Sequence, residues 1–308
     1  MSPYARSRRR FLADAGLAAG AAALLGPRLA RAAEAAGLHL SSNAYSWHVY
    51  YQREKKNFGA DLDAGLADVA RSGLNGYEPG IGGPGDIDRH APLLKKHGLE
   101  MRSIYTGSTL HLPDKAEQSI ARILAVAAKA KEAGTRILVT NPDANPNKTD
   151  EQLKTQAESL GTLGKKLAEM GVTLAYHNHS VEMQKEGREF HSVMDGTDPK
   201  VVTLCLDAHW VWRGAGNSKE VLDAVVKKHG ARVSELHLRQ SVGKVWSETF
   251  GEGDIDYPAL AASLAPFKVK PLLVMEIAVE KGTPSTMTAV EAHRKSAEAA
   301  RKVFAALG

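Results

Sequence analysis

Short apolar runs alternate with longer amphipathic segments along most of this 308-residue chain. The apolar runs are continuous, which is typical of strands buried on both faces of a parallel sheet. The segments between them place apolar residues every three or four positions, which predicts helices with one buried face. The predicted strands are 38–44, 73–78, 99–105, 136–140, 171–176, 201–206, 233–238 and 270–275, and the predicted helices are 60–71, 87–97, 114–133, 150–170, 189–195, 218–229, 257–264 and 286–307.

The order of these elements predicts one α/β domain, a single (β/α)8 barrel. Eight strand–helix units follow one another without a low-complexity linker, and a barrel of roughly 250 residues fits the length of the chain. A doubly wound open sheet is the alternative, but no dinucleotide-binding glycine fingerprint follows the first strand. Since catalytic residues of such barrels lie at the carboxyl ends of the strands, those ends are where a functional site is expected.

Four predicted strands end in residues that can bind a metal or transfer a proton. These residues are Tyr176, His177, Asn178, His179 and Glu182 after the fifth strand, Asp207 and His209 after the sixth, His237 after the seventh and Glu276 after the eighth. A buried strand holds such a side chain on a rigid support. One ending of this kind is a weak signal, but four together indicate a chemically active face.

Composition and charge exclude some classes of function. The formal net charge is +5, but residues 1–32 hold six arginines and only one aspartate. The rest of the chain carries 34 basic and 34 acidic residues, so it offers no overall basicity for binding nucleic acid. The single cysteine, Cys205, excludes an internal disulfide and lies in an apolar run, where a small core residue is expected.

The first 32 residues resemble an export signal. Residues 7–12 read S-R-R-R-F-L, which resembles the twin-arginine motif, and an alanine- and leucine-rich segment follows at 13–26. That segment is too short and too weakly apolar for a stable membrane span, and a small-residue cleavage site follows at 30–32. We therefore expect a signal peptide at 1–32, a barrel domain at 33–308, a periplasmic location and no membrane span after cleavage.

Together these features resemble the xylose isomerase-like barrel superfamily, which includes sugar isomerases, ketose 3-epimerases, inosose dehydratases and endonuclease IV. The resemblance rests on the order of the units, the strand-end residues, Y-H-N-H-x-x-E at 176–182 and G-E-G-D-I-D-Y at 251–257. The branch that carries the first motif is described loosely as sugar phosphate isomerase/epimerase. An endonuclease IV function would need three zinc ions and a basic face, which a neutral, exported chain does not favour.

The resemblance implies a site for one divalent metal ion. Its ligands in the epimerases are a Glu, an Asp, a His and a Glu after strands five to eight, and Asp207, His237 and Glu276 match the last three. His177 stands where relatives have the first Glu, so either His177 binds the metal or Glu182 reaches in from five residues beyond. A shell of histidine and carboxylate ligands suits Mn²⁺, Co²⁺, Fe²⁺ or Zn²⁺ better than Mg²⁺.

Other residues on this face are expected to act on the substrate. The candidate acid–base groups are Glu182, His179 and His209, and the candidate substrate contacts are Trp47, Glu78, Trp210, Arg239 and Trp246. Aromatic side chains commonly stack on sugar rings. Relatives have a substrate-binding histidine where Trp210 stands, and commonly an acidic residue where Arg239 and Gln240 stand. These departures point away from simple ketose epimerisation.

The expected chemistry begins with proton removal next to a sugar carbonyl. A divalent cation acidifies the neighbouring C–H bond, and a carboxylate or imidazole then moves the proton. Isomerisation, epimerisation and β-elimination all start this way, so an isomerase or epimerase and a lyase or hydratase acting on 3-keto-glycosides both stay open. The expected substrate is an unphosphorylated sugar or keto-sugar. A non-catalytic periplasmic sugar-binding protein is a third interpretation, and the oligomeric state is left open.

Overall fold

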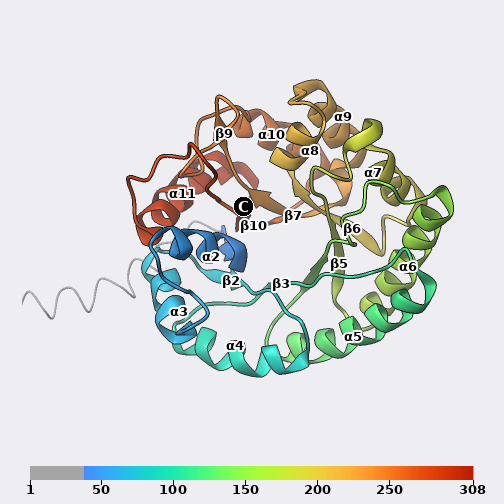
Figure 1. Ribbon diagram of the computed structural model, residues 1–308, viewed down its shortest axis with the longest axis horizontal. Helices are drawn as coiled ribbons and strands as arrows, with labels where there is room; N and C mark the ends of the chain where they lie inside the picture. The colour runs from blue at the N-terminus through green and yellow to red at the C-terminus, as the bar shows by residue number, and fades with distance from the viewer. Residues whose placement is uncertain (1–37, 308) are drawn as a thin grey trace, which may run out of the picture. The chain divides into compact units, whose positions relative to one another are not determined.

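The computed structural model describes residues 38–307, which form a ring of eight parallel strands surrounded by helices (Figure 1). The strands are β1 (Leu40–Asn43), β2 (Gly76–Glu78), β3 (Ser103–Tyr105), β4 (Ile137–Thr140), β5 (Thr173–His177), β6 (Val202–Asp207), β7 (Val233–Leu238) and β10 (Leu272–Met275). They pair in the order β2-β1-β10-β7-β6-β5-β4-β3. Backbone bonds from Tyr77 N to Glu100 O (3.0 Å) and from Ile81 N to Tyr105 O (2.8 Å) join the β2 and β3 segments and close the ring. The expected (β/α)8 barrel is therefore confirmed.

Helices alternate with the strands and cover the outside of the barrel. They are α2 (Ala44–Arg53), α3 (Leu62–Arg71), α4 (Pro84–Lys96), α5 (Pro113–Glu132), α6 (Asp150–Glu169), α7 (Gln184–Gly196), α8 (Ala208–Gly214), α9 (Lys219–His229), α10 (Tyr257–Leu264) and α11 (Ala289–Val303). Their amphipathic pattern is visible in α11, where Ala292, Ser296 and Ala300 lie on the buried face. Within residues 38–307, no helix has both the length and the apolar character that crossing a membrane requires.

Two short helices begin at strand ends where the sequence pattern predicts none. α2 follows β1 directly, and α8 follows β6 directly. Asn43 Oδ1 accepts a hydrogen bond from Ser46 N at 3.2 Å, and Asp207 Oδ1 accepts one from Trp210 N at 2.9 Å. Asn and Asp are strongly preferred N-caps, so each strand end starts the helix that follows it. α8 has only seven residues, which is too short to show a clear helical periodicity.

An apolar cluster lies inside the barrel. The residues packed together there are Ile137, Val139, Ala175 and Cys205, with Tyr105 and Leu272 against them. Side chains two positions apart on a strand share a face of the sheet. His177 therefore continues the inward-facing row of Ala175 on β5, and Asp207 continues that of Cys205 on β6. The same strands thus supply apolar packing at the centre and polar side chains at the carboxyl end.

The pairing of β6 with β7 contains a register shift. Leu204 pairs with Val233, but the next residue, Cys205, pairs with Glu235, so β7 has one extra residue at this point. Beyond the shift, Asp207 pairs with His237. Bulges of this kind re-aim side chains next to functional sites. Here the shift brings two strand-end residues of the candidate site side by side.

The chain after β7 forms a small hairpin of β8 (Ser241–Val242) and β9 (Val245–Trp246). Gly243 and Lys244 connect the two strands with positive φ angles of 58° and 70°, as a type I′ turn requires. Asp254 accepts hydrogen bonds from Gly243 N at 3.0 Å and Lys244 N at 2.7 Å, which holds the turn in place. The sequence pattern predicts only a long excursion here, because strands of two residues are too short to show any periodicity.

Candidate metal and active site

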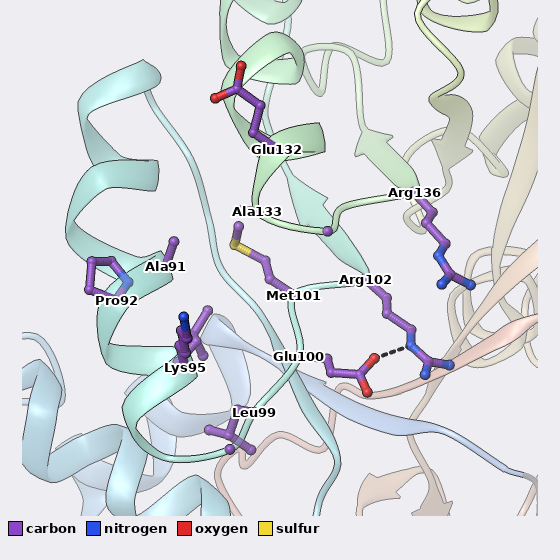
Figure 2. Close-up of a pocket in the computed structure, with 13 residues that line it drawn as sticks. Ala91, Pro92, Lys95, Leu99, Glu100, Met101, Arg102, Glu132, Ala133 and Arg136 are labelled. Carbon is purple, nitrogen blue, oxygen red and sulfur yellow. Dashed lines mark hydrogen bonds and ion pairs between the residues drawn. The ribbon is translucent and has the colours of Figure 1, made fainter.

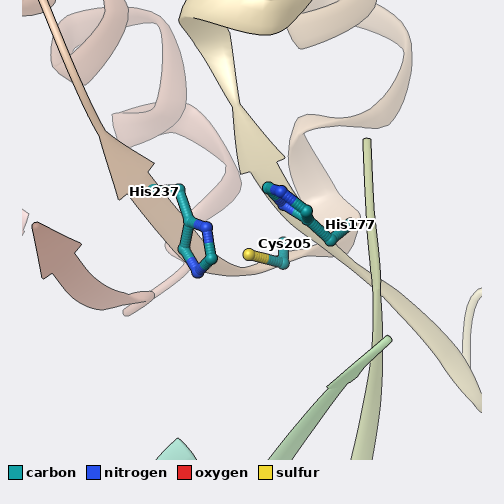
Figure 3. A group of neighbouring side chains, drawn as sticks. All are labelled: His177, Cys205 and His237. Carbon is teal, nitrogen blue, oxygen red and sulfur yellow. The ribbon is translucent and has the colours of Figure 1, made fainter. Parts of the chain in front are cut away.

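The four residues expected to bind a metal lie together at the carboxyl ends of β5, β6, β7 and β10. Donor atoms of His177, Asp207 and Glu276 all lie within 4.8 Å of one another, and all three residues are buried. His237 joins them, because its Nδ1 lies 2.6 Å from Glu276 Oε2 and its ring centroid lies 4.5 Å from that of His177. Figure 3 shows the His177 and His237 rings on either side of the Cys205 side chain. The four residues are called the metal group below.

Several atoms of the metal group have no hydrogen-bond partner among the described residues. They are both ring nitrogens of His177, Oδ2 of Asp207 and Nδ1 of His237, and all are buried. Buried polar atoms are nearly always satisfied, and exceptions can mark a place for an ion or a functional group. Two imidazoles and two carboxylates also form a donor set that suits Mn²⁺, Fe²⁺, Co²⁺ or Zn²⁺. The residues present therefore fit a divalent cation.

Neighbouring side chains orient the two carboxylates of the metal group. Asn43 Nδ2 donates a hydrogen bond to Glu276 Oε2 at 2.5 Å. Asp207 uses Oδ1 to cap α8, which leaves Oδ2 for the site. Asn178 Nδ2 donates a hydrogen bond to the carbonyl oxygen of Asp207 at 3.1 Å, and Asn178 Oδ1 accepts one from the Asp207 backbone N–H at 3.2 Å. No role is predicted for Asn43 from the sequence, where its only signal is its position at the end of the first strand.

Arg239 lies beside the metal group and is almost fully buried. Its Nη2 forms an ion pair with Glu276 Oε1 and lies 3.8 Å from Asp207 Oδ2. Its Cζ lies 4.7 Å from the ring centroid of Trp210 and 4.6 Å from that of Trp246, which are cation–π distances. Three predicted substrate contacts therefore form one cluster next to the predicted ligands. Nη1 of Arg239 is buried without a hydrogen-bond partner in the described residues.

Burial and the Arg239 charge set the protonation states of the metal group. Burial raises the pKa of Asp207 to about 6, although Arg239 opposes the shift. Burial also lowers the pKa of His177 well below its usual value, so its imidazole is neutral. Burial disfavours the charge on Glu276, but Arg239 and His237 outweigh this effect and hold its pKa well below the ordinary range. Burial disfavours the charge on His237, but Cys205, Glu78 and Glu276 outweigh this effect and hold its pKa well above the ordinary value. At neutral pH the other three residues thus present deprotonated donors, and His237 would release a proton when a metal binds.

A second polar cluster lies next to His237 on the inside of the barrel. His237 Nε2 lies 3.1 Å from Glu235 Oε1 and 3.2 Å from Glu78 Oε1, and both carboxyl groups are fully buried. Ser103 Oγ donates to Glu78 Oε2 at 2.7 Å, and the Cys205 thiol donates to Glu235 Oε1 at 3.7 Å. Glu235 is not among the site residues predicted from the sequence, although its position two residues before His237 on the same strand face is a usable signal.

The three candidate acid–base residues occupy different environments. His179 is half-buried, its ring centroid lies 4.6 Å from that of His177, and burial lowers its pKa. Glu182 is fully buried, and its carboxylate accepts bonds from His179 N at 2.7 Å and from Asn141 Nδ2 at 3.1 Å. His209 is fully buried, with Nε2 3.1 Å from Ser241 Oγ. His179 is thus the one of the three that combines exposure with closeness to the metal group.

Two predicted substrate contacts are not on an open surface. The sequence predicts such a contact at Trp47, but its ring is fully buried and stacks on His293 with centroids 4.0 Å apart. Trp47 belongs to α2, a helix that the sequence pattern did not predict, so its position in the loop region was misjudged. Glu78 is also fully buried and faces His237 and Ser103. Both side chains are enclosed by other residues, and their roles as substrate contacts stay predictions.

A cavity of about 840 Å³ lies away from the metal group, between α4 and α5 (Figure 2). Its lining includes Lys95, Glu132 and Arg136 together with Glu100 and Arg102, which are joined by a hydrogen bond of 2.5 Å. β3 and β4 begin directly after Arg102 and Arg136, so the cavity lies at the amino ends of the strands. None of the predicted site residues lines it. Catalytic sites of this fold lie at the opposite face.

Comparison with known proteins agrees with the observed fold. The family model described as "Xylose isomerase-like TIM barrel" matches residues 66–303. The chain belongs to this family. The match runs from α3 to the end of α11 and therefore includes every residue of the metal group.

Several known proteins are similar to this chain. An inosose dehydratase of Bacillus cereus is 26% identical over 193 residues, which cover 56% of this chain and 61% of that relative. The chain thus spans about three fifths of the relative's length. The solved structure of the IolI protein with a bound zinc atom has a TM-score of 0.66 at 17% identity and covers 88% of this chain and 99% of its own. The Escherichia coli 3-keto-D-glucoside 4-epimerase has a TM-score of 0.58 at 16% identity, with 88% and 98% covered.

Proposed function

We propose that this chain is a divalent-metal-dependent enzyme that moves a proton next to a carbonyl group of an unphosphorylated sugar or keto-sugar. The observation that carries the proposal is the metal group itself. Buried atoms of His177, Asp207 and His237 lack partners among the described residues, and Glu276 lies against them. A cation held by these four residues would polarise the substrate carbonyl and acidify the adjacent C–H bond.

His179 is the residue best placed to move the proton. It is half-buried beside His177, and its lowered pKa keeps the imidazole neutral, so it can accept a proton near neutral pH. Glu182 supports it by holding its backbone amide at 2.7 Å. The acid–base role predicted for Glu182 stays a prediction, because its carboxylate is enclosed and already accepts two hydrogen bonds.

Arg239 and the two tryptophans are suited to hold a neutral sugar. Nη1 of Arg239, which has no hydrogen-bond partner among residues 38–307, can donate to a substrate oxygen. The half-buried Trp210 offers an aromatic face. The guanidinium already neutralises Glu276 and faces Asp207, so it is poorly suited to clamp a phosphate. An unphosphorylated substrate also agrees with the proposed export to the periplasm, since sugar phosphates are largely cytoplasmic.

Two reaction outcomes start from the same proton transfer. Epimerisation returns the proton to the other face of the carbon, and dehydration expels water from the neighbouring carbon. The Bacillus cereus relative is named a dehydratase and the Escherichia coli structure a 3-keto-D-glucoside 4-epimerase. Both names support sugar-directed carbonyl chemistry in the family, and we propose an epimerase or a lyase acting on a keto-sugar as the two specific alternatives for this chain.

The test is incubation with a panel of sugars and 3-keto-sugars in D₂O, with and without added Mn²⁺, Co²⁺, Fe²⁺ or Zn²⁺. Metal-dependent uptake of deuterium at one carbon supports the proposed proton transfer, and product analysis separates epimerisation from loss of water. Binding of a sugar without deuterium exchange under every metal condition would instead identify a non-catalytic sugar-binding protein. The His179→Ala protein serves as the matched negative control, because it keeps all four residues of the metal group.

A further inference from the structure

Glu78 and Glu235 form a pair of carboxyl groups enclosed in the barrel. Glu78 comes from β2 and Glu235 from β7, and neither has measurable exposure. Taking a carboxylate out of water costs several kcal/mol unless it finds partners. Among ion pairs in residues 38–307, each of the two contacts only His237. Burying two carboxyl groups against one imidazole costs free energy, so this arrangement needs a physical reason.

The geometry around the His237 ring supplies that reason. Nε2 is within 3.1 Å of Glu235 Oε1 with the geometry of a hydrogen bond, and Glu78 Oε1 is 3.2 Å away. Nδ1, on the other side of the ring, makes no hydrogen bond within residues 38–307, although it lies 2.6 Å from Glu276 Oε2. One nitrogen is therefore held by acceptors inside the barrel, and the other faces Glu276 and the rest of the metal group.

We propose that Glu78 and Glu235 are positioning residues that keep the proton of His237 on Nε2 and so leave the Nδ1 lone pair for the cation. A metal-binding histidine commonly donates its second N–H to a carboxylate, which fixes its tautomer and ring orientation. The inference rests on the proposed metal-dependent function. It assigns the two acids a role that acts only through His237, rather than a contact with substrate.

A second cation between Glu78, Glu235 and His237 is the competing interpretation, because their donor atoms also lie within 4.8 Å of one another. The hydrogen-bond donors around the pair favour a proton instead. Ser103 Oγ and the Cys205 thiol already donate to these carboxyl groups, so hydrogens occupy part of their acceptor capacity. A second cation on Nε2 would also displace the proton that the acceptors hold.

The experiment measures Zn²⁺ affinity by competition with a fluorescent chelator, on purified protein stripped of metal. Replacing Glu78 and Glu235 by leucine removes the hydrogen-bond acceptors and fills the buried space with apolar side chains of similar volume. Such a replacement of buried ionic groups can leave folding stability intact. We expect the Glu78→Leu/Glu235→Leu protein to bind Zn²⁺ about 10–100-fold more weakly. Glu235→Gln keeps an acceptor oxygen and should show a smaller loss.

Two controls separate positioning from general damage. Glu189→Gln changes another buried carboxylate, which pairs with Lys148 at 2.5 Å outside the metal group, and it should leave Zn²⁺ affinity unchanged. In the His237→Ala background, the two leucine substitutions should cause no further loss of affinity, because their effect passes through the imidazole. Thermal unfolding of each variant checks that the protein is folded.

The outcomes are distinguishable. Wild-type protein that binds one Zn²⁺ per chain, together with the losses described above, supports the inference. Unchanged affinity in the double-leucine protein, or an equal loss in the His237→Ala background, overturns it and leaves the proposed function standing. Two Zn²⁺ per chain in the wild type, with one lost in the double-leucine protein, would identify a second metal site instead. Absence of Zn²⁺ binding in the wild type would remove the proposed function and the inference together.

Discussion

Asp207 accepts a hydrogen bond from the backbone N–H of Trp210 at 2.9 Å through Oδ1, while its Oδ2 lies buried without a hydrogen-bond partner in the described residues. One carboxylate therefore starts helix α8 and also faces the metal group. The two functions use different oxygen atoms, so substitutions can separate them.

Asp207→Asn should keep the helix cap and lose the metal, whereas Asp207→Ala should lose both. Asparagine is an effective N-cap and alanine is not, so Asp207→Ala should be about 1 kcal/mol less stable than Asp207→Asn. Elemental analysis of the purified proteins measures metal content, and chemical denaturation measures the stability difference. Full metal occupancy in either protein would refute the assignment of Asp207 as a ligand.

Metal-free wild-type protein should lose stability relative to Asp207→Asn as the pH rises. Burial raises the pKa of Asp207 to about 6 in the folded state, above the value of about 4 for an unfolded chain. The folded protein then binds this proton more tightly, so the contribution is fully present below about pH 4 and is lost as the pH passes about 6. The expected loss is on the order of 3 kcal/mol. Denaturation in the presence of a chelator at pH 4 and pH 7 tests this, and equal differences at both pH values would contradict it.

His177→Ala should be poor in metal, and Glu182→Gln should retain it. His177 presents two ring nitrogens that have no hydrogen-bond partner in the described part of the chain, so its loss should weaken metal binding by roughly 10-fold or more. Glu182 is bonded to His179 N and Asn141 instead. Our expectation for Glu182→Gln is full metal content with turnover lowered by about 10²–10⁴-fold, as for loss of an acid–base group. Metal loss in Glu182→Gln, with retention in His177→Ala, would mean that the two roles are reversed.

Trp47→Ala should destabilise the fold, while Trp210→Ala should mainly weaken substrate binding. Trp47 is fully buried against His293, and truncation of such a side chain costs roughly 3–5 kcal/mol. Trp210 is half-buried beside Arg239. Denaturation midpoints and KM for any substrate found by the deuterium-exchange screen separate the two effects. A Trp47→Ala protein with wild-type stability and a raised KM would instead support the substrate contact that the sequence predicts for Trp47.

Replacing Arg8 and Arg9 by lysine should trap the precursor in the cytoplasm. The two arginines belong to the segment that resembles a twin-arginine signal, and they lie outside the residues that the structure describes. Cell fractionation and N-terminal sequencing measure the location of the protein and the cleavage point, which we expect after Ala32. An unchanged periplasmic yield of the variant would rule out this export route.

The sequence pattern predicts the barrel and the four strand ends that carry the metal group. Continuous apolar runs mark strands buried on both faces, and eight of them separated by amphipathic helices leave few topologies other than a (β/α)8 barrel. In parallel strands the carboxyl ends lie at one edge, so His177, Asp207, His237 and Glu276 could be grouped without coordinates.

Contacts between side chains across the barrel interior could not be predicted from the sequence, because periodicity shows that a side chain is buried but not which residues it contacts. Glu78 and Glu235 lie 157 positions apart in the sequence, and both contact His237 because the strands form a ring. The register shift between β6 and β7 sets the position of His237 along the barrel axis. The same limit explains the position of Trp47, which depends on the short helix α2. Local pattern determines the elements and their order, whereas ring closure, strand register and capping determine which side chains touch.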